Sequence, residues 1–112
     1  MLDRTAGQLQ RYMDLLSARQ KLVATNIANA ETPGYRTQDI DFQSEFESAI
    51  GGSPRLLQPD GLAAKNDGNN VSLDREARLL SENAMRFSIA SNLMRLQLQT
   101  VKEAINEGKS GA

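Results

Sequence analysis

Two long stretches of the chain place apolar residues at alternating steps of four and three, and this pattern limits the fold more than any other feature. Such spacing keeps one apolar seam along one side of a helix, where a partner helix can cover it. We therefore expect an all-α fold in which two long amphipathic helices, over residues 3–30 and 72–107, pair as a coiled-coil-like hairpin. With one polar interruption each, the repeats run through Leu2, Ala6, Leu9, Met13, Leu16, Gln20, Val23, Ile27 and Ala30, and through Leu73, Ala77, Leu80, Ala84, Phe87, Ser91, Met94, Leu98, Val101 and Ile105.

The seam between the two helices is expected to consist mainly of large apolar side chains. We expect its centre at Leu16 and Val23 on the first helix and at Phe87 and Met94 on the second. The full set of expected seam residues is Leu9, Met13, Leu16, Val23, Ile27, Leu80, Phe87, Met94, Leu98 and Val101.

The second helix carries a further apolar stripe, which lies largely away from the seam. A helix that is apolar nearly all round is normally buried, so this stripe needs a second partner. Either the middle segment of the chain folds back over it, or a neighbouring subunit covers it. The sequence favours the neighbouring subunit, because the middle segment has few apolar residues to offer. The stripe consists of Met85, Ile89, Leu93 and Leu96.

A chain of 112 residues has room for one small domain. Pro33 ends the first helix, because proline cannot continue it and pushes Thr32 out of helical geometry. Ser72 is a candidate N-cap for the second helix, and Gly108 is expected to end it. The expected parts of this domain are a helix at 3–30, a loop with a short helix at 31–71, a helix at 72–107 and a tail at 108–112.

The middle segment should contain one short helix, capped by Asp41 and ended by the glycine pair at 51–52. Asp39 and Asp41 alternate, so they could point the same way and share a cation or a proton, although a loop followed by a helix cap is the favoured interpretation. The rest of the segment is rich in turn formers, which predicts a surface loop that is mobile unless a neighbour orders it. The apolar face of the short helix would consist of Phe42, Phe46, Ala49 and Ile50.

Composition excludes most kinds of chemistry. The chain contains no cysteine and no histidine, so Ser–His and Cys–His catalysis, disulfides and thiolate or histidine metal sites are ruled out. A net charge of −1 argues against nucleic acid as a partner. We also expect no cofactor, no small-molecule substrate and no enzymatic activity. The N-terminal residues lack the apolar stretch of a cleavable signal peptide, and no apolar run is long enough to span a membrane.

The segment NIANAETPGY, residues 26–35, is unusual for the end of a helix. Asn26 and Asn29 are weak helix formers one turn apart, so their amides share a face and can bind a neighbouring backbone or side chain. The four residues 32–35 predict a type II turn, with Pro33 at the second position and Gly34 at the third, where φ must be positive. A helix end frayed by its asparagines is the alternative interpretation.

Residues 24–36 of this chain read ATNIANAETPGYR. This segment resembles the signature of the flagellar rod and hook proteins. The stretch GNNVSLDREARLLSENAMRF, residues 68–87, is similar to the start of the C-terminal helix in the proximal rod proteins of that family. Thr25 and Glu31 depart from the residues that the family more commonly has there. The signature positions are Asn26, Ile27, Asn29, Ala30, Thr32, Pro33, Gly34 and Tyr35.

The resemblance implies a structural subunit of the flagellar basal body, in its proximal rod. Such a subunit polymerises helically through its N- and C-terminal helices, connects the membrane-embedded base to the distal rod and transmits torque for motility. The implied location is the periplasm-spanning rod, reached without a cleavable signal peptide. The implied partners are copies of the chain itself, other rod proteins, the membrane-ring/rod junction protein, the rod cap protein and the flagellar type III export apparatus.

The resemblance also implies roles for particular residues. The signature is expected to shape the contact between subunits, with Tyr35 as an anchor pressed against a neighbour. Phe42, Phe46 and Ile50 fit the short phenylalanine-containing element by which export substrates dock at the export gate. That pattern is short, and simple helix packing by the two phenylalanines is the favoured interpretation.

Two other functions fit parts of the sequence. A cytosolic helical adaptor or export chaperone would also be small, rich in heptads and free of cysteine, and it would form a stable soluble dimer. A membrane-surface helix is less well supported, because the basic residues of the first helix are mixed with acidic ones and no strong basic face forms.

Overall fold

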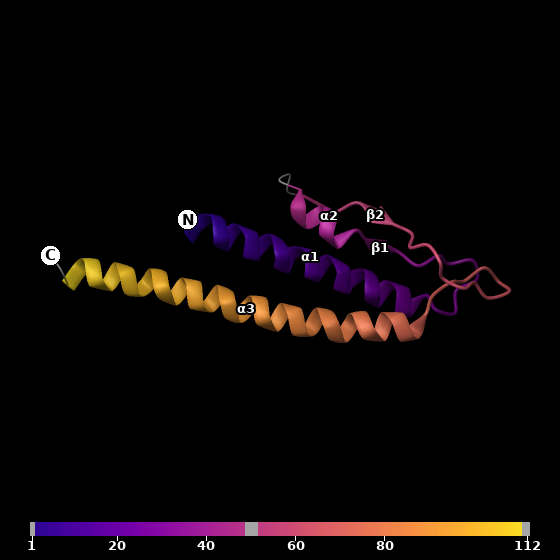
Figure 1. Ribbon diagram of the computed structural model, residues 1–112. Coiled ribbons are helices and arrows are strands. Elements are labelled where there is room, and N and C mark those ends of the chain that lie inside the picture. Colours follow the sequence, from indigo (N-terminus) through magenta and orange to yellow (C-terminus); the bar gives the residue numbers. More distant parts are fainter. Residues whose placement is uncertain (1, 49–51, 111–112) are drawn as a thin grey trace.

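Two long helices lie side by side and antiparallel in the computed structural model, which describes residues 2–48 and 52–110 (Figure 1). The molecule is elongated, measuring 72 × 25 × 17 Å along its principal axes. The predicted all-α hairpin is therefore confirmed, with one small two-stranded sheet added. In chain order the elements are α1 (Leu2–Ala28), β1 (Asp39–Ile40), α2 (Phe42–Glu47), β2 (Leu56–Leu57) and α3 (Leu73–Ser110).

The middle segment packs on α1, on the side away from α3 (Figure 1). Its helix α2 presents Phe42 and Phe46 to Tyr12 of α1, with ring centroids 5.4 and 5.6 Å apart and the rings edge to face. Strands β1 and β2 pair antiparallel, and Ile40 of β1 is buried. The middle segment thus covers α1, and the second apolar stripe of α3 stays 47–60% exposed.

The helix boundaries differ from the expected ones by a few residues. Helix α1 ends at Ala28, two residues earlier than expected, and turns lead on from there. Ser72 caps α3 as predicted, since its hydroxyl accepts a hydrogen bond of 3.2 Å from the Arg75 amide. Helix α3 continues through Gly108 to Ser110, where a tail was expected. One glycine costs a helix only about 1 kcal/mol, which does not force it to stop.

The contact between α1 and α3 is displaced from part of the expected seam. Leu16 and Val23 are buried as expected, and Leu9, Met13, Met94 and Val101 are half-buried. On α3 the innermost row is Glu76, Asn83 and Ala90, one position before the expected apolar row. Because this inner row is polar or small, the apolar pattern alone could not find it. The expected seam residues Ile27, Leu80 and Phe87 are 38–41% exposed, and Leu98 is 63% exposed.

The turn after α1 depends on glycine. Tyr35 N donates to Thr32 O at 3.2 Å and Gly34 has φ of 75°, the positive value predicted for the third position of this turn. Gly34→Ala is expected to lower the free energy of unfolding by about 1–2 kcal/mol, since a Cβ disfavours this left-handed backbone. Gly7→Ala is the matched control: Gly7 lies inside α1 with open space around its Cα, so alanine should stabilise by about 0.5–1 kcal/mol. Urea unfolding followed by circular dichroism measures both, and equal effects would contradict the assignment.

Candidate functional site

The signature segment closes a buried polar junction around Asn26, near the end of α1. The Asn26 side chain is 1% exposed and makes four hydrogen bonds. Its Nδ2 donates to Gln38 O (2.8 Å) and to Oε1 of Glu76 on α3 (3.1 Å). Its Oδ1 accepts from the Tyr35 hydroxyl (2.9 Å) and from Gln38 N (3.1 Å). A single amide therefore ties α1, the signature turn and α3 together, with its full hydrogen-bonding capacity used.

Two asparagines just before α3 hold the same turn from the other side. Asn69 Nδ2 donates to the carbonyl oxygens of Asn29 (2.9 Å) and Thr32 (2.8 Å), which lie in the turns after α1. Asn70 Oδ1 accepts from Thr37 N at 2.6 Å. Both asparagines are fully buried. The segment that was expected to be a mobile loop therefore ends in an ordered clamp on the signature.

A chain of ion pairs extends the junction along the helices. Arg19 of α1 donates two hydrogen bonds to Asp39 of β1, from Nε to Oδ1 at 3.0 Å and from Nη2 to Oδ2 at 2.9 Å. Arg75 of α3 donates to the same Asp39 and, at 2.8 Å, to Glu76. The two positive charges of the arginines are thus balanced by the two negative charges of the carboxylates. The bidentate pair of Arg19 with Asp39 is the strong, direction-specific form of such contacts.

Burial and these partners shift three pKa values in the junction. Burial, helped by the nearby charge of Glu76, raises the pKa of the Tyr35 hydroxyl. Burial also raises the pKa of Glu76, and the opposing attraction of Arg75 does not fully compensate. Burial alone would raise the pKa of Asp39 too, but hydrogen bonds from Arg19, the Ile40 amide and Arg75 bring it below its usual value. Asp39 is therefore held ionised, while the charge of Glu76 is costly.

The structure brings together part of the predicted signature. Asn26 and Tyr35 meet in the junction, and Ala30 is buried beside it. Asn29 bonds to nearby residues instead: its Nδ2 donates to Thr25 O in the last turn of α1, and its Oδ1 accepts from Thr32 Oγ1. The remaining signature positions, Ile27, Thr32, Pro33 and Gly34, are exposed.

The expected contact with a neighbouring subunit could directly involve only those signature residues that are exposed. Asn26 is sealed inside the subunit, so it can shape such a contact only through the turn that it holds. Tyr35, the expected anchor, is half-buried and its hydroxyl is used within the subunit. Pro33 and Gly34 lie at the surface of the turn.

The candidate export element is folded against α1. Phe42 and Phe46 are half-buried and pack on Tyr12, which is the helix packing that the sequence favoured. Ile50, the third residue of the element, lies outside the described residues. Asp41 caps α2 by accepting a hydrogen bond from Ser44 N at 3.2 Å, so it does not share a cation with Asp39.

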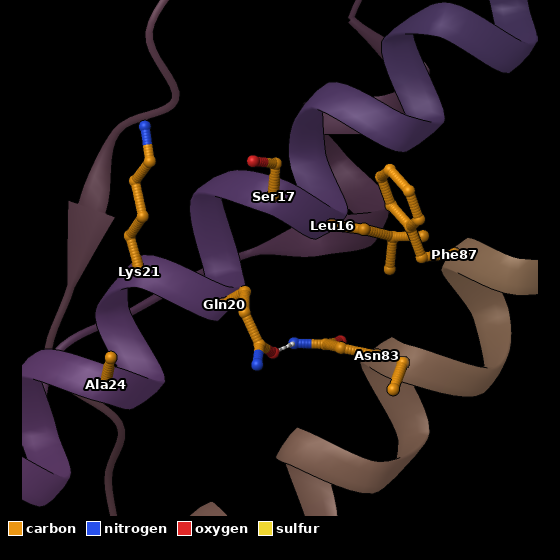
Figure 2. Close-up of a pocket in the computed structure, with 8 residues that line it drawn as sticks. Leu16, Ser17, Gln20, Lys21, Ala24, Asn83 and Phe87 are labelled. Carbon is orange, nitrogen blue, oxygen red and sulfur yellow. Dashed lines mark hydrogen bonds between the residues drawn. The ribbon is translucent and has the colours of Figure 1, made fainter. Parts of the chain in front are cut away.

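A groove of about 510 Å³ runs between α1 and α3 on one side of the helix pair (Figure 2). Gln20 and Asn83 meet across it through a hydrogen bond of 3.4 Å, and Phe87 stands at one end, 41% exposed. Small side chains leave the rest of the groove open. Its lining is Leu16, Ser17, Gln20, Lys21, Ala24, Asn83, Ala84 and Phe87.

The described residues offer no group of three or more Asp, Glu, His or Cys that could hold a metal ion. Both buried carboxylates of the junction face arginine instead. Within the described part of the chain, no helix has the length and apolar character that crossing a membrane requires. The arrangement is suited to fixing one helix against another and to presenting apolar faces.

Sequence reasoning missed most of the junction. Arg19, Asp39, Asn70, Arg75 and Glu76 were not assigned to it. One signal was available, because Glu76 and Asn83 lie seven residues apart and so share a helix face. Polar residues on an inward row indicate specific partners rather than an apolar seam.

Comparison with known proteins gives consistent results. Residues 13–36 match the family described as Flagella basal body rod protein. The chain is 31% identical to the flagellar basal body rod protein FlgB of Borrelia hermsii, over 85% of this chain and 90% of that protein. It is 28% identical to the FlgB protein of Salmonella typhimurium, over 96% of this chain and 99% of that protein. It is 26% identical to the FlgB protein of Escherichia coli K12, with the same coverage.

Proposed function

The chain belongs to the FlgB family of flagellar basal body rod proteins, as a structural subunit of the proximal rod, and we propose that it polymerises through the exposed faces of its α1–α3 pair. It assembles with other flagellar rod components in the basal body.

The single observation that carries this proposal is how little apolar surface one subunit buries. Among the described residues, the buried apolar side chains are Leu15, Leu16, Val23, Ala30, Ile40 and Ala90. Several larger apolar side chains of α3, such as Met85 and Leu96, remain more than half exposed. A small domain of this kind gains stability when neighbours cover such faces. The polar junction supports this role, because it fixes the angle between the helices before neighbours pack against them.

We further propose the partners that a rod subunit of this position needs. These are copies of itself, the membrane-ring/rod junction protein, the rod cap protein and the type III export apparatus, in a rod that spans the periplasm. Export through that apparatus would take place with the chain unfolded. Because Phe42 and Phe46 pack on Tyr12 in the folded subunit, they could dock at an export gate only before folding.

An immunoblot tests the location directly. Purified, detergent-resistant basal bodies are compared with the cytosol of the same cells. Enrichment in the basal bodies is expected. A folded cytosolic pool with no signal in the basal bodies would instead support the adaptor or export chaperone.

A substitution in the helix pair separates export from assembly. Met94 lies half-buried on α3, so Met94→Asp is expected to reduce incorporation by on the order of tenfold or more, since a charge in an apolar contact costs well above the 1.4 kcal/mol that a factor of ten represents. Secretion should persist, because export uses the unfolded chain. The control is Asn92→Asp, the same new charge at an exposed position of α3. Loss of secretion for Met94→Asp alone would count against this separation of roles.

A further inference from the structure

Helix α3 has two unpartnered apolar faces, and they lie on nearly opposite sides of it. Ala84 and Phe87 face the groove between the helices. The residues Ile89 and Leu93, 54% and 47% exposed, belong to the stripe on the other side. At 3.6 residues per turn these two sets of side chains point away from each other. A single partner helix therefore cannot cover both faces of α3.

The two faces also differ in shape at the level of the groove, although the groove side of α3 carries large exposed side chains further along, such as Leu98. The groove is hollow because small side chains such as Ser17, Ala24 and Ala84 line it. The stripe carries large side chains, with Met85 60% and Leu96 58% exposed. A row of large apolar side chains on a helix is the form that fits an apolar groove.

Unpaired charges on the two sides have opposite sign. Lys21 lines the groove, and Lys102 lies eighteen residues, or five full turns, beyond Ala84 and so on the same side of α3. Glu103 and Glu107 lie five turns beyond Met85 and Ile89, and so on the stripe side. Within the described part of the chain, none of these four charged residues forms an ion pair.

We propose that the stripe of one copy docks into the groove of a second copy, with Glu103 and Glu107 facing Lys102 on the groove side. This inference rests on the proposed function, because it says which surfaces of the rod subunit meet. When one face of a copy binds a different face of the next copy, each added copy leaves a free face for another. Such contacts build an open helical array, as a rod requires. A two-fold contact would instead place lysine side against lysine side or glutamate side against glutamate side, which like charges disfavour.

Cysteine cross-linking tests the contact, since the natural chain contains no cysteine. Basal bodies are purified from cells that express Ala84→Cys, Ile89→Cys or the double variant, and treated with a short bis-maleimide. All three positions used, including the control Ser88, are exposed on α3. The double variant Ala84→Cys/Ile89→Cys is expected to give a ladder of cross-linked copies, and each single variant none. Ala84→Cys/Ser88→Cys should give no ladder, because Ser88 lies about 100° around the helix from Ile89 and therefore off the stripe.

Each outcome decides for or against the proposed contact. Dimers formed by Ile89→Cys alone would show that the stripe pairs with itself and overturn the proposal. Cross-links from Ile89→Cys only to a different rod protein would assign the stripe to that protein and also overturn it. A subunit present in basal bodies without a ladder refutes the contact but leaves the rod function intact. Absence of the unmodified subunit from basal bodies would refute the rod function itself.

Discussion

Asn26→Ala is expected to lower the free energy of unfolding by about 3–5 kcal/mol, because several buried groups lose their partner at once and each costs about 1–3 kcal/mol. The groups that lose a hydrogen bond are the Tyr35 hydroxyl, the Gln38 backbone and the Glu76 carboxylate, which keeps its bond from Arg75. The site is sealed, so water cannot replace the amide without opening the junction. Urea unfolding of the full chain measures the loss, and incorporation into basal bodies should fall with it.

Two control variants separate this effect from a general loss of polar groups. Tyr35→Phe removes one of the four hydrogen bonds and should cost about 1 kcal/mol. Asn92→Ala removes an exposed amide on α3 and should stay within about 0.5 kcal/mol of the natural chain. If Asn26→Ala cost no more than Asn92→Ala, the junction would not hold the helix pair.

The sequence allowed the helices and their caps to be predicted, because these depend on local chemistry. Apolar spacing located both helices, Ser72 and Asp41 were identified as caps, and Gly34 was identified as the residue with positive φ. The end of α3 was misplaced because Gly108 only weakens a helix. The pairing of β1 with β2 was missed, since two-residue strands have no periodicity to detect.

The junction could be predicted only in part, because it depends on contacts far apart in the chain. Asn26 was identified through the signature, yet its partner Glu76 is fifty residues away. Asp39 was read as a loop carboxylate, and nothing in its neighbourhood predicts two arginines from different helices. The displaced seam has the same origin, since tertiary hydrogen bonds to Glu76 draw a polar row inward.

A rod subunit benefits from this division between polar interior and apolar exterior. Directional bonds at the junction fix one angle between α1 and α3, whereas a purely apolar seam could slide. The apolar faces then remain free for neighbours. The signature contributes mainly by closing the junction, and its exposed residues Pro33 and Gly34 stay candidates for direct contact.

Asp39→Asn is expected to cost about 3–5 kcal/mol at neutral pH, because it leaves Arg19 and Arg75 close together without their shared counter-charge. A surface control is Glu103→Gln, which removes an exposed carboxylate from α3 and should change stability by less than about 0.5 kcal/mol. Chemical unfolding at constant ionic strength measures both variants.

The pH dependence gives this prediction a second, independent readout. The pKa of Asp39 is lower in the folded chain than its usual value of about 3.9. Its stabilising contribution to the free energy of unfolding is therefore present above that value and is lost as the pH falls through the folded pKa. The stability contribution of Glu76 depends on pH in the opposite direction, because its pKa is raised in the folded chain. That contribution is present below about pH 4.3 and is lost as the pH rises through the folded pKa. The natural chain should therefore lose stability below about pH 4, and Asp39→Asn should lose less over the same range. Parallel curves for the two proteins would show that Asp39 does not bind the arginines as an ionised carboxylate.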